Sequence, residues 1–137
     1  MVKRQSFKTT ATESTSRFHI NEPLNHDKLK PIFSFHHMEY GGKNCLSRCD
    51  GVSRALIVGT LLQLSQKTWS QILSTCKETL GKENIPVKQF KVRLPRIVTP
   101  EVKSLMVFRF SESERMAGIR HKDIYHILIV GDDLYNH

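Results

Sequence analysis

The sequence predicts an α+β fold in which a two-helix hairpin packs on one face of a mainly antiparallel four- to five-stranded sheet, giving two layers. Three observations predict it. Residues 104–135 contain three consecutive strand patterns joined by short polar turns. Residues 50–80 carry apolar side chains at helical spacing. Shorter alternating segments at 31–36 and 88–94 supply the remaining strands.

The first strand is predicted at residues 31–36, where aromatic side chains alternate with smaller ones. A glycine-containing loop at residues 39–44 follows it. Asp50 or Ser53 then suits the N-cap of a helix that ends near Leu64. Its apolar face is so wide that we expect other elements to cover the helix.

The second helix of the predicted hairpin has a suitable N-cap in Ser65. Gly81 stands where a helix C-terminus favours a left-handed residue. One stripe at helical spacing is formed by Trp69, Ile72, Leu73, Cys76 and Leu80. We expect this stripe to anchor the hairpin on the sheet, since burying each large apolar side chain contributes about 1.5–3 kcal/mol.

The remaining strands follow the hairpin. In residues 88–94 apolar and polar side chains alternate, which predicts a strand. Pro95 and Pro100 bracket a connection that cannot pair continuously. Of the three strands after it, residues 124–130 are apolar almost throughout, as expected of a central strand.

Composition and charge describe one basic domain. The 137 residues can bury one core, and 21 Lys and Arg against 13 Asp and Glu give a formal charge of +8. This charge favours an anionic partner, either nucleic acid or an acidic protein segment. Residues 1–30 are predicted to be a flexible basic arm rich in Ser and Thr, and 31–137 a single domain. With no run of signal-peptide or membrane-spanning length and an odd number of cysteines, we expect a cytoplasmic protein with no membrane partner.

Alternation predicts which side chains share the sheet face that the helices leave open. If each strand turns its more apolar side to the helices, the opposite side collects Lys91, Arg93, Arg109, Met116 and Arg120. The facing of the last strand stays open, so either Tyr125 or His126 joins them. Cations around an aromatic or imidazole group suit single-stranded nucleic acid. The alternative is that these arginines are solvated charges on edge strands.

The motifs VFRF at 107–110 and GIRH at 118–121, the ending LYNH, the order of elements and the basic charge resemble the RelE/ParE-like toxins of bacterial toxin–antitoxin systems. The resemblance implies a helical hairpin over an antiparallel sheet whose open face cleaves messenger RNA. It also implies association with the ribosome and neutralisation by an acidic antitoxin protein. No cofactor is implied. Two other classes of function remain open. One is a non-enzymatic nucleic-acid-binding or regulatory module, and the other is a protein that binds an acidic partner.

Metal-free RNA cleavage needs a base, an acid and cations at the phosphate. Our hypothesis assigns Arg109 and Arg120 to the phosphate and His126 or His137 to proton transfer, with Tyr135 or Tyr125 for stacking or acid work. Histidine suits proton transfer because it titrates near neutrality. The residues predicted to bind RNA are Lys91, Arg93, Arg115, His121 and Tyr125.

Four side chains capable of binding zinc, His36, His37, Cys45 and Cys49, lie within a short span. Their spacing is unfavourable, because adjacent strand histidines point to opposite faces. We therefore expect the thiols to pack as small hydrophobic groups and no metal to bind.

Overall fold

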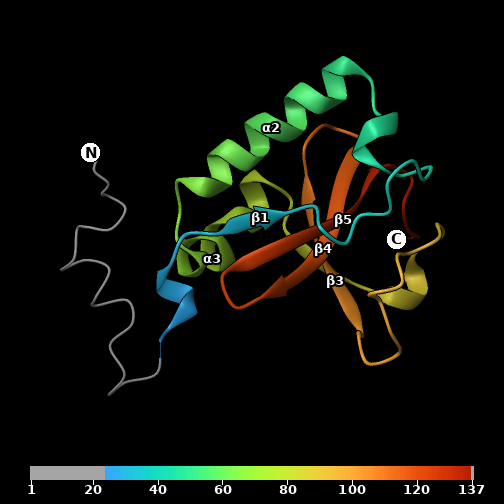
Figure 1. Ribbon diagram of the computed structural model, residues 1–137. Coiled ribbons are helices and arrows are strands. Elements are labelled where there is room, and N and C mark those ends of the chain that lie inside the picture. The colour runs from blue at the N-terminus through green and yellow to red at the C-terminus, as the bar shows by residue number, and fades with distance from the viewer. Residues whose placement is uncertain (1–23, 137) are drawn as a thin grey trace, which may run out of the picture.

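The computed structural model describes residues 24–136 and has the predicted α+β fold, with two helices over a mostly antiparallel sheet (Figure 1). The helices are α2 (Gly51–Ser65) and α3 (Trp69–Thr79). The strands are β1 (Ile32–Ser34), β2 (Glu83–Pro86), β3 (Ser104–Arg109), β4 (Glu114–His121) and β5 (Ile124–Asp132). Short 3-10 turns are η1 (His26–Lys28), η2 (Leu46–Arg48) and η3 (Val87–Gln89). Residues 1–23 of the predicted arm lie outside the described residues.

Within residues 24–136 the sheet has the order β1-β5-β4-β3-β2, in which β1 and β5 are parallel and the other neighbouring strands are antiparallel. The three strands predicted within residues 104–135 are confirmed as β3, β4 and β5, paired as consecutive antiparallel neighbours. The β4–β5 turn contains Lys122, which has a left-handed φ of 59°. The helical hairpin leads from β1 to β2 at the opposite edge of the sheet. The connection between β1 and its parallel neighbour β5 therefore contains both helices and the three other strands.

Asp50, one of the two predicted candidates, is the N-cap of helix α2. Its carboxylate accepts a hydrogen bond of 2.8 Å from the Ser53 amide. Its buried side is formed by Ser53, Ile57, Thr60 and Leu64. The expectation that the whole helix is covered is wrong, since the side chains of Val58 and Leu62 are 64% and 62% exposed. The sheet lies on one side of α2 only (Figure 1).

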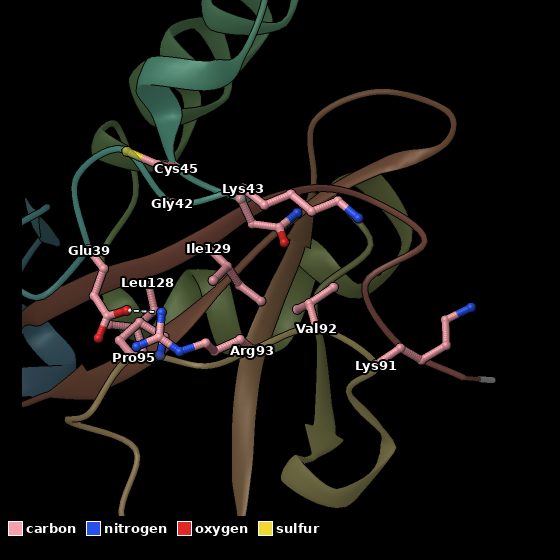
Figure 2. A pocket seen from close by; sticks show the side chains of 11 residues that line it. Glu39, Gly42, Lys43, Cys45, Lys91, Val92, Arg93, Pro95, Leu128 and Ile129 are labelled. Atoms are coloured by element: carbon pink, nitrogen blue, oxygen red, sulfur yellow. Dashed lines mark ion pairs between the residues drawn. The ribbon is translucent and has the colours of Figure 1, made fainter.

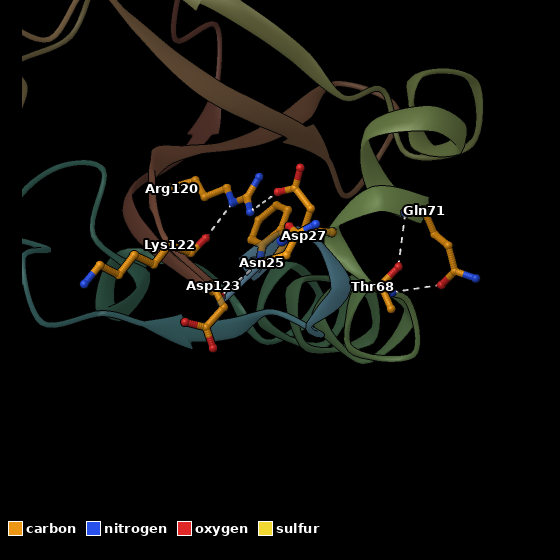
Figure 3. Close-up of polar contacts among 8 residues, drawn as sticks. Asn25, Asp27, Thr68, Gln71, Arg120, Lys122 and Asp123 are labelled. Atoms are coloured by element: carbon orange, nitrogen blue, oxygen red, sulfur yellow. Dashed lines mark hydrogen bonds and ion pairs between the residues drawn. The ribbon is translucent and has the colours of Figure 1, made fainter. Parts of the chain in front are cut away.

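Helix α3 begins later than the sequence predicts. Ser65 is the last residue of α2, and Thr68 is the N-cap in a capping box with Gln71 (Figure 3). The anchoring stripe is confirmed for Trp69, Ile72, Cys76 and Leu80, all of which are buried. Leu73 is 40% exposed because the buried stripe passes beside it. Gly81 ends the hairpin with the predicted left-handed φ of 60°.

The strand predicted at residues 88–94 is wrong. Residues Glu83–Pro86 pair with β3 instead, η3 follows, and Phe90 makes only an isolated bridge to Tyr135. The apolar alternation in this stretch has a different cause, because its apolar side chains cover the sheet without pairing to it. We call residues 87–103 the covering segment.

The sheet face opposite the helices, here called the outer face, is not open as predicted. Its buried cluster is formed by Ile85, Leu105, Val107, Ala117, Leu128, Ile129, Leu134 and Tyr135. Side chains of the covering segment pack against it, among them Val92, Val98 and Val102. Figure 1 shows this segment and α2 on different sides of the sheet. The outer face is covered because both sides of β3 and β5 are apolar.

A β-bulge in β5 determines which of its side chains face the helices and which face outward. Ala117 pairs with Ile129 and Gly118 with Ile127, so Leu128 is the extra residue. Before the bulge Tyr125 and Ile127 face the helices and His126 faces outward. After the bulge the alternation is reversed, and Val130 faces the helices. Neither of the two predicted alternatives therefore holds along the whole strand.

Candidate functional site

The outer face brings together most of the residues that the sequence singles out. Some of these residues alternate with the outward side chains of β3, β4 and β5, and others belong to the covering segment. The residues at the outer face are Lys91, Arg93, Arg109, Arg115, His121, His126 and Tyr135. Arg120, Tyr125 and Met116 lie on the helix face. His137 lies outside the described residues.

Arg120 does not join Arg109, contrary to the prediction that both share one face. Its guanidinium lies 4.4 Å from the centre of the Trp69 ring, and its Nη2 is 2.5 Å from the Asp27 carboxylate (Figure 3). Its Nε also donates a hydrogen bond of 2.7 Å to the carbonyl oxygen of Lys122. Arg120 therefore links η1 to the start of α3, and these contacts explain why it lies on the helix face.

Replacing Arg120 by alanine is expected to lower the free energy of unfolding by about 1–2 kcal/mol, because a stacked and largely buried cation is lost. Denaturant titration measures the change. Arg93→Ala is the control, since that guanidinium is 78% exposed in its ion pair with Glu39. Equal stability of the two variants would contradict the structural assignment of Arg120.

Tyr125 is a core residue and is not accessible for RNA stacking. Its hydroxyl donates a hydrogen bond of 2.7 Å to the carbonyl oxygen of Met106, and its ring packs edge-on against Phe108. Burial raises the pKa of Tyr125 well above its ordinary value, so the phenol stays neutral. Tyr135 is also buried, on the outer face, with its ring 5.3 Å from that of Phe90.

Arg109 and Arg115 lie side by side on β3 and β4, as a directly opposite cross-strand pair. Arg109 lies over Gly81, where an added Cβ would be 2.9 Å from the Cβ of Arg109. The Arg115 guanidinium folds back onto the carbonyl oxygens of the β3–β4 turn. Two neighbouring cations on one face form a surface that attracts anions.

A first hollow on the outer face, the lysine–arginine hollow, has a volume of about 430 Å³ (Figure 2). It lies between the loop after β1, the covering segment and β5, and its charged lining residues are Glu39, Lys43, Lys91 and Arg93. Arg93 Nη1 is 3.0 Å from Glu39 Oε1, and Lys91 pairs with Asp133. The hollow is therefore cationic, with two of its cations partly neutralised.

Cys45 also lines the lysine–arginine hollow, and its side chain is buried, as expected for a packed thiol. Burial by itself would raise the pKa of Cys45, but hydrogen bonds from the side chain and backbone of Ser47, together with Gly41 and the charge of Arg48, lower that pKa. Within the described residues no group of three or more His, Cys, Asp or Glu side chains is placed to hold a metal ion.

A second hollow, the histidine hollow, has a volume of about 350 Å³ and lies between the covering segment and the β4–β5 hairpin. Its polar lining residues are His37, His121 and His126. The rings of His37 and His126 have their centres 5.1 Å apart. The sequence could not indicate this pairing, because His37 follows β1 and His126 lies on β5.

The pKa of His126 is lowered in the folded protein. Burial is the main cause that lowers its pKa, followed by the nearby charges of His37, His121 and His36. Its Nδ1 is buried and has no hydrogen-bond partner among residues 24–136. Nε2 is therefore the ring nitrogen that can exchange a proton with a ligand, and the ring is neutral at neutral pH.

We expect the free energy of unfolding to fall as the pH drops below 6.5, the ordinary pKa of histidine. Below this pH the unfolded chain binds a proton at His126 that the folded chain binds less readily, because its folded pKa is lowered. Above this pH both states hold His126 neutral and the effect vanishes. Denaturant titrations at neutral and mildly acid pH should show that the free energy of unfolding depends less steeply on pH in His126→Asn than in the wild-type protein. An unchanged dependence in His126→Asn would count against this assignment.

The two hollows are neighbours, because Leu128 lines both. A neutral imidazole can accept a proton, and a second imidazole can donate one. The lysine and arginine side chains of the lysine–arginine hollow can neutralise a phosphate. Together these groups form the set that acid/base chemistry at a phosphodiester requires.

Among the described residues, no helix has both the length and the apolar character needed to cross a membrane. The chain matches no protein-family model, no curated protein and no solved structure.

Proposed function

We propose that the protein is an endoribonuclease that cleaves messenger RNA by metal-free acid/base chemistry on its outer face. The observation that carries the proposal is His126, an imidazole with a lowered pKa that lies beside His37 and next to the lysine–arginine hollow. Messenger RNA, cytoplasmic action at the ribosome and control by an acidic antitoxin follow from the resemblance to RelE/ParE-like toxins. The net charge of +8 supports both anionic partners.

The proposed reaction is an internal transfer. His126 Nε2 takes the proton of the RNA 2′-hydroxyl, and the 2′-oxygen forms a bond to phosphorus. The bond from phosphorus to the 5′-oxygen breaks, and His121 or His37 protonates the leaving oxygen. Lys91 and Arg93 bind the neighbouring phosphate of the RNA backbone. The products are a 2′,3′-cyclic phosphate and a 5′-hydroxyl, so no metal or cofactor is consumed.

The test uses the purified full chain, an end-labelled single-stranded RNA and EDTA. We expect fragments that end in cyclic phosphate. RNA that stays intact at protein concentrations that saturate binding would contradict cleavage. That outcome would favour the alternative of a non-enzymatic nucleic-acid-binding or regulatory module.

The double variant Lys91→Ala/Arg93→Ala is expected to weaken RNA binding and to reduce the slope of log affinity against log salt by about 1–2, because two phosphate contacts are lost. Fluorescence anisotropy at several salt concentrations measures it. Lys28→Ala/Lys77→Ala is the matched control, since it removes two exposed cations from η1 and α3. Identical slopes in the two variants would show that the lysine–arginine hollow does not contact RNA.

A further inference from the structure

A third hollow continues the outer-face surface beyond the histidine hollow. It has a volume of about 800 Å³, lies between η3 and the end of the covering segment, and contains Lys88 and Lys103. Val102 lines both this hollow and the histidine hollow. Leu128 likewise lines both the first and the second hollow, so the three hollows form one row along the covering segment.

Charge is distributed unevenly along this row of hollows. Cations lie at both ends, with Lys43, Lys91 and Arg93 in the first hollow and Lys88 and Lys103 in the third. The histidine hollow lies between them and has apolar walls. The acidic groups near the ends already have partners, because Glu39 pairs with Arg93 and Glu101 accepts a hydrogen bond from Thr99.

The two cations of the third hollow are not explained by the packing of residues 24–136. The side chains of Lys88 and Lys103 are exposed, and Lys103 Nζ donates a hydrogen bond of 3.2 Å to the carbonyl oxygen of Pro100. Apolar walls between separated cations suit an extended polyanion whose bases contact the walls and whose phosphates reach the cations. A rigid duplex presents its bases inside the helix and offers nothing to such walls.

We infer that one single strand of RNA occupies all three hollows, with the reacting phosphate at the histidine hollow and the flanking phosphates at the two cationic ends. This inference rests on the proposed function and specifies its substrate as an extended single strand of about four nucleotides or more. Lys88 and Lys103 then bind RNA at a distance from the reacting bond. Their contribution appears only with substrates long enough to reach them.

The test measures the binding of 2′-O-methyl oligoribonucleotides, which cannot be cleaved, by fluorescence anisotropy. We expect wild-type protein to bind an octanucleotide much more tightly than a dinucleotide. Lys88→Ala/Lys103→Ala should weaken octanucleotide binding roughly ten-fold and leave dinucleotide binding unchanged. Lys28→Ala/Lys77→Ala, which removes the same charge from the helix side, should have a much smaller effect.

The outcomes separate this inference from the proposed cleavage. Equal octanucleotide binding by the two double variants, or no gain from dinucleotide to octanucleotide, overturns the three-hollow path even if RNA is cut. Length-dependent binding that requires Lys88 and Lys103 supports the path even if no RNA is cut. The absence of any binding by wild-type protein overturns both.

Discussion

Gly118→Ala should lower the free energy of unfolding by more than about 3 kcal/mol. An added Cβ would be 2.0 Å from the carbonyl oxygen of His126 and 3.1 Å from Cε1 of Tyr125. The first of these atoms belongs to the backbone of β5 at the bulge, so no side-chain rotation relieves the contact. Chemical denaturation followed by circular dichroism measures the loss, and the far-ultraviolet spectrum shows whether the variant folds.

Gly59→Ala is the matched control for this prediction. Gly59 lies inside α2, and an added Cβ there would meet no atom within 4 Å. Alanine should therefore raise the free energy of unfolding by about 0.5–1 kcal/mol, because glycine is a poor helix former. If Gly118→Ala were as stable as Gly59→Ala, the close approach of β4 and β5 at the bulge would be wrong.

The largest effect on activity is expected for His126→Asn, which should reduce the single-turnover rate of RNA cleavage by about 10²–10⁴. Asparagine keeps a polar side chain but cannot take up a proton near neutral pH. In wild-type protein the rate should fall toward acid pH as His126 becomes protonated. Because its pKa is lowered, this loss should begin below the ordinary histidine pKa of 6.5.

Arg120→Ala is the control for activity, since Arg120 contacts Trp69 and Asp27 on the other face of the sheet. At a temperature where both variants are folded, it should cut RNA at close to the wild-type rate. A large loss in Arg120→Ala together with full activity in His126→Asn would place the reaction on the helix face. That result would refute the proposed site.

The sequence predicted the fold class well because local patterns determine it. The three strands from 104 to 135 and the buried stripe of α3 follow from spacing and turn residues. The prediction of a strand at residues 88–94 was wrong because side chains that cover a sheet alternate in the same way as side chains within a strand. Thr68 was missed as a cap because Ser65 has equal intrinsic preference and only the capping box with Gln71 separates them.

The candidate site was predictable in composition but not in arrangement. Outward placement of Arg109 followed from alternation. Lys91 and Arg93 lie at the outer face through the covering segment and not through the predicted strand, and Met116 and Arg120 were assigned to the wrong face. Neither side of β4 is clearly the more apolar in sequence, because Met116 and Arg120 alternate with Ala117 and Ile119, so alternation alone could not orient this strand. The bulge at Leu128 and the contact of His37 with His126 depend on tertiary pairing, which no local pattern contains.

RNA binding across the histidine hollow can be followed through the histidine imidazole NMR signals when a 2′-O-methyl oligoribonucleotide is added to the full chain. We expect shifts for His37, His121 and His126 and none for His26 on η1. Unchanged signals from these three histidines at saturating RNA, with backbone shifts on the exposed side of α2 instead, would contradict this binding.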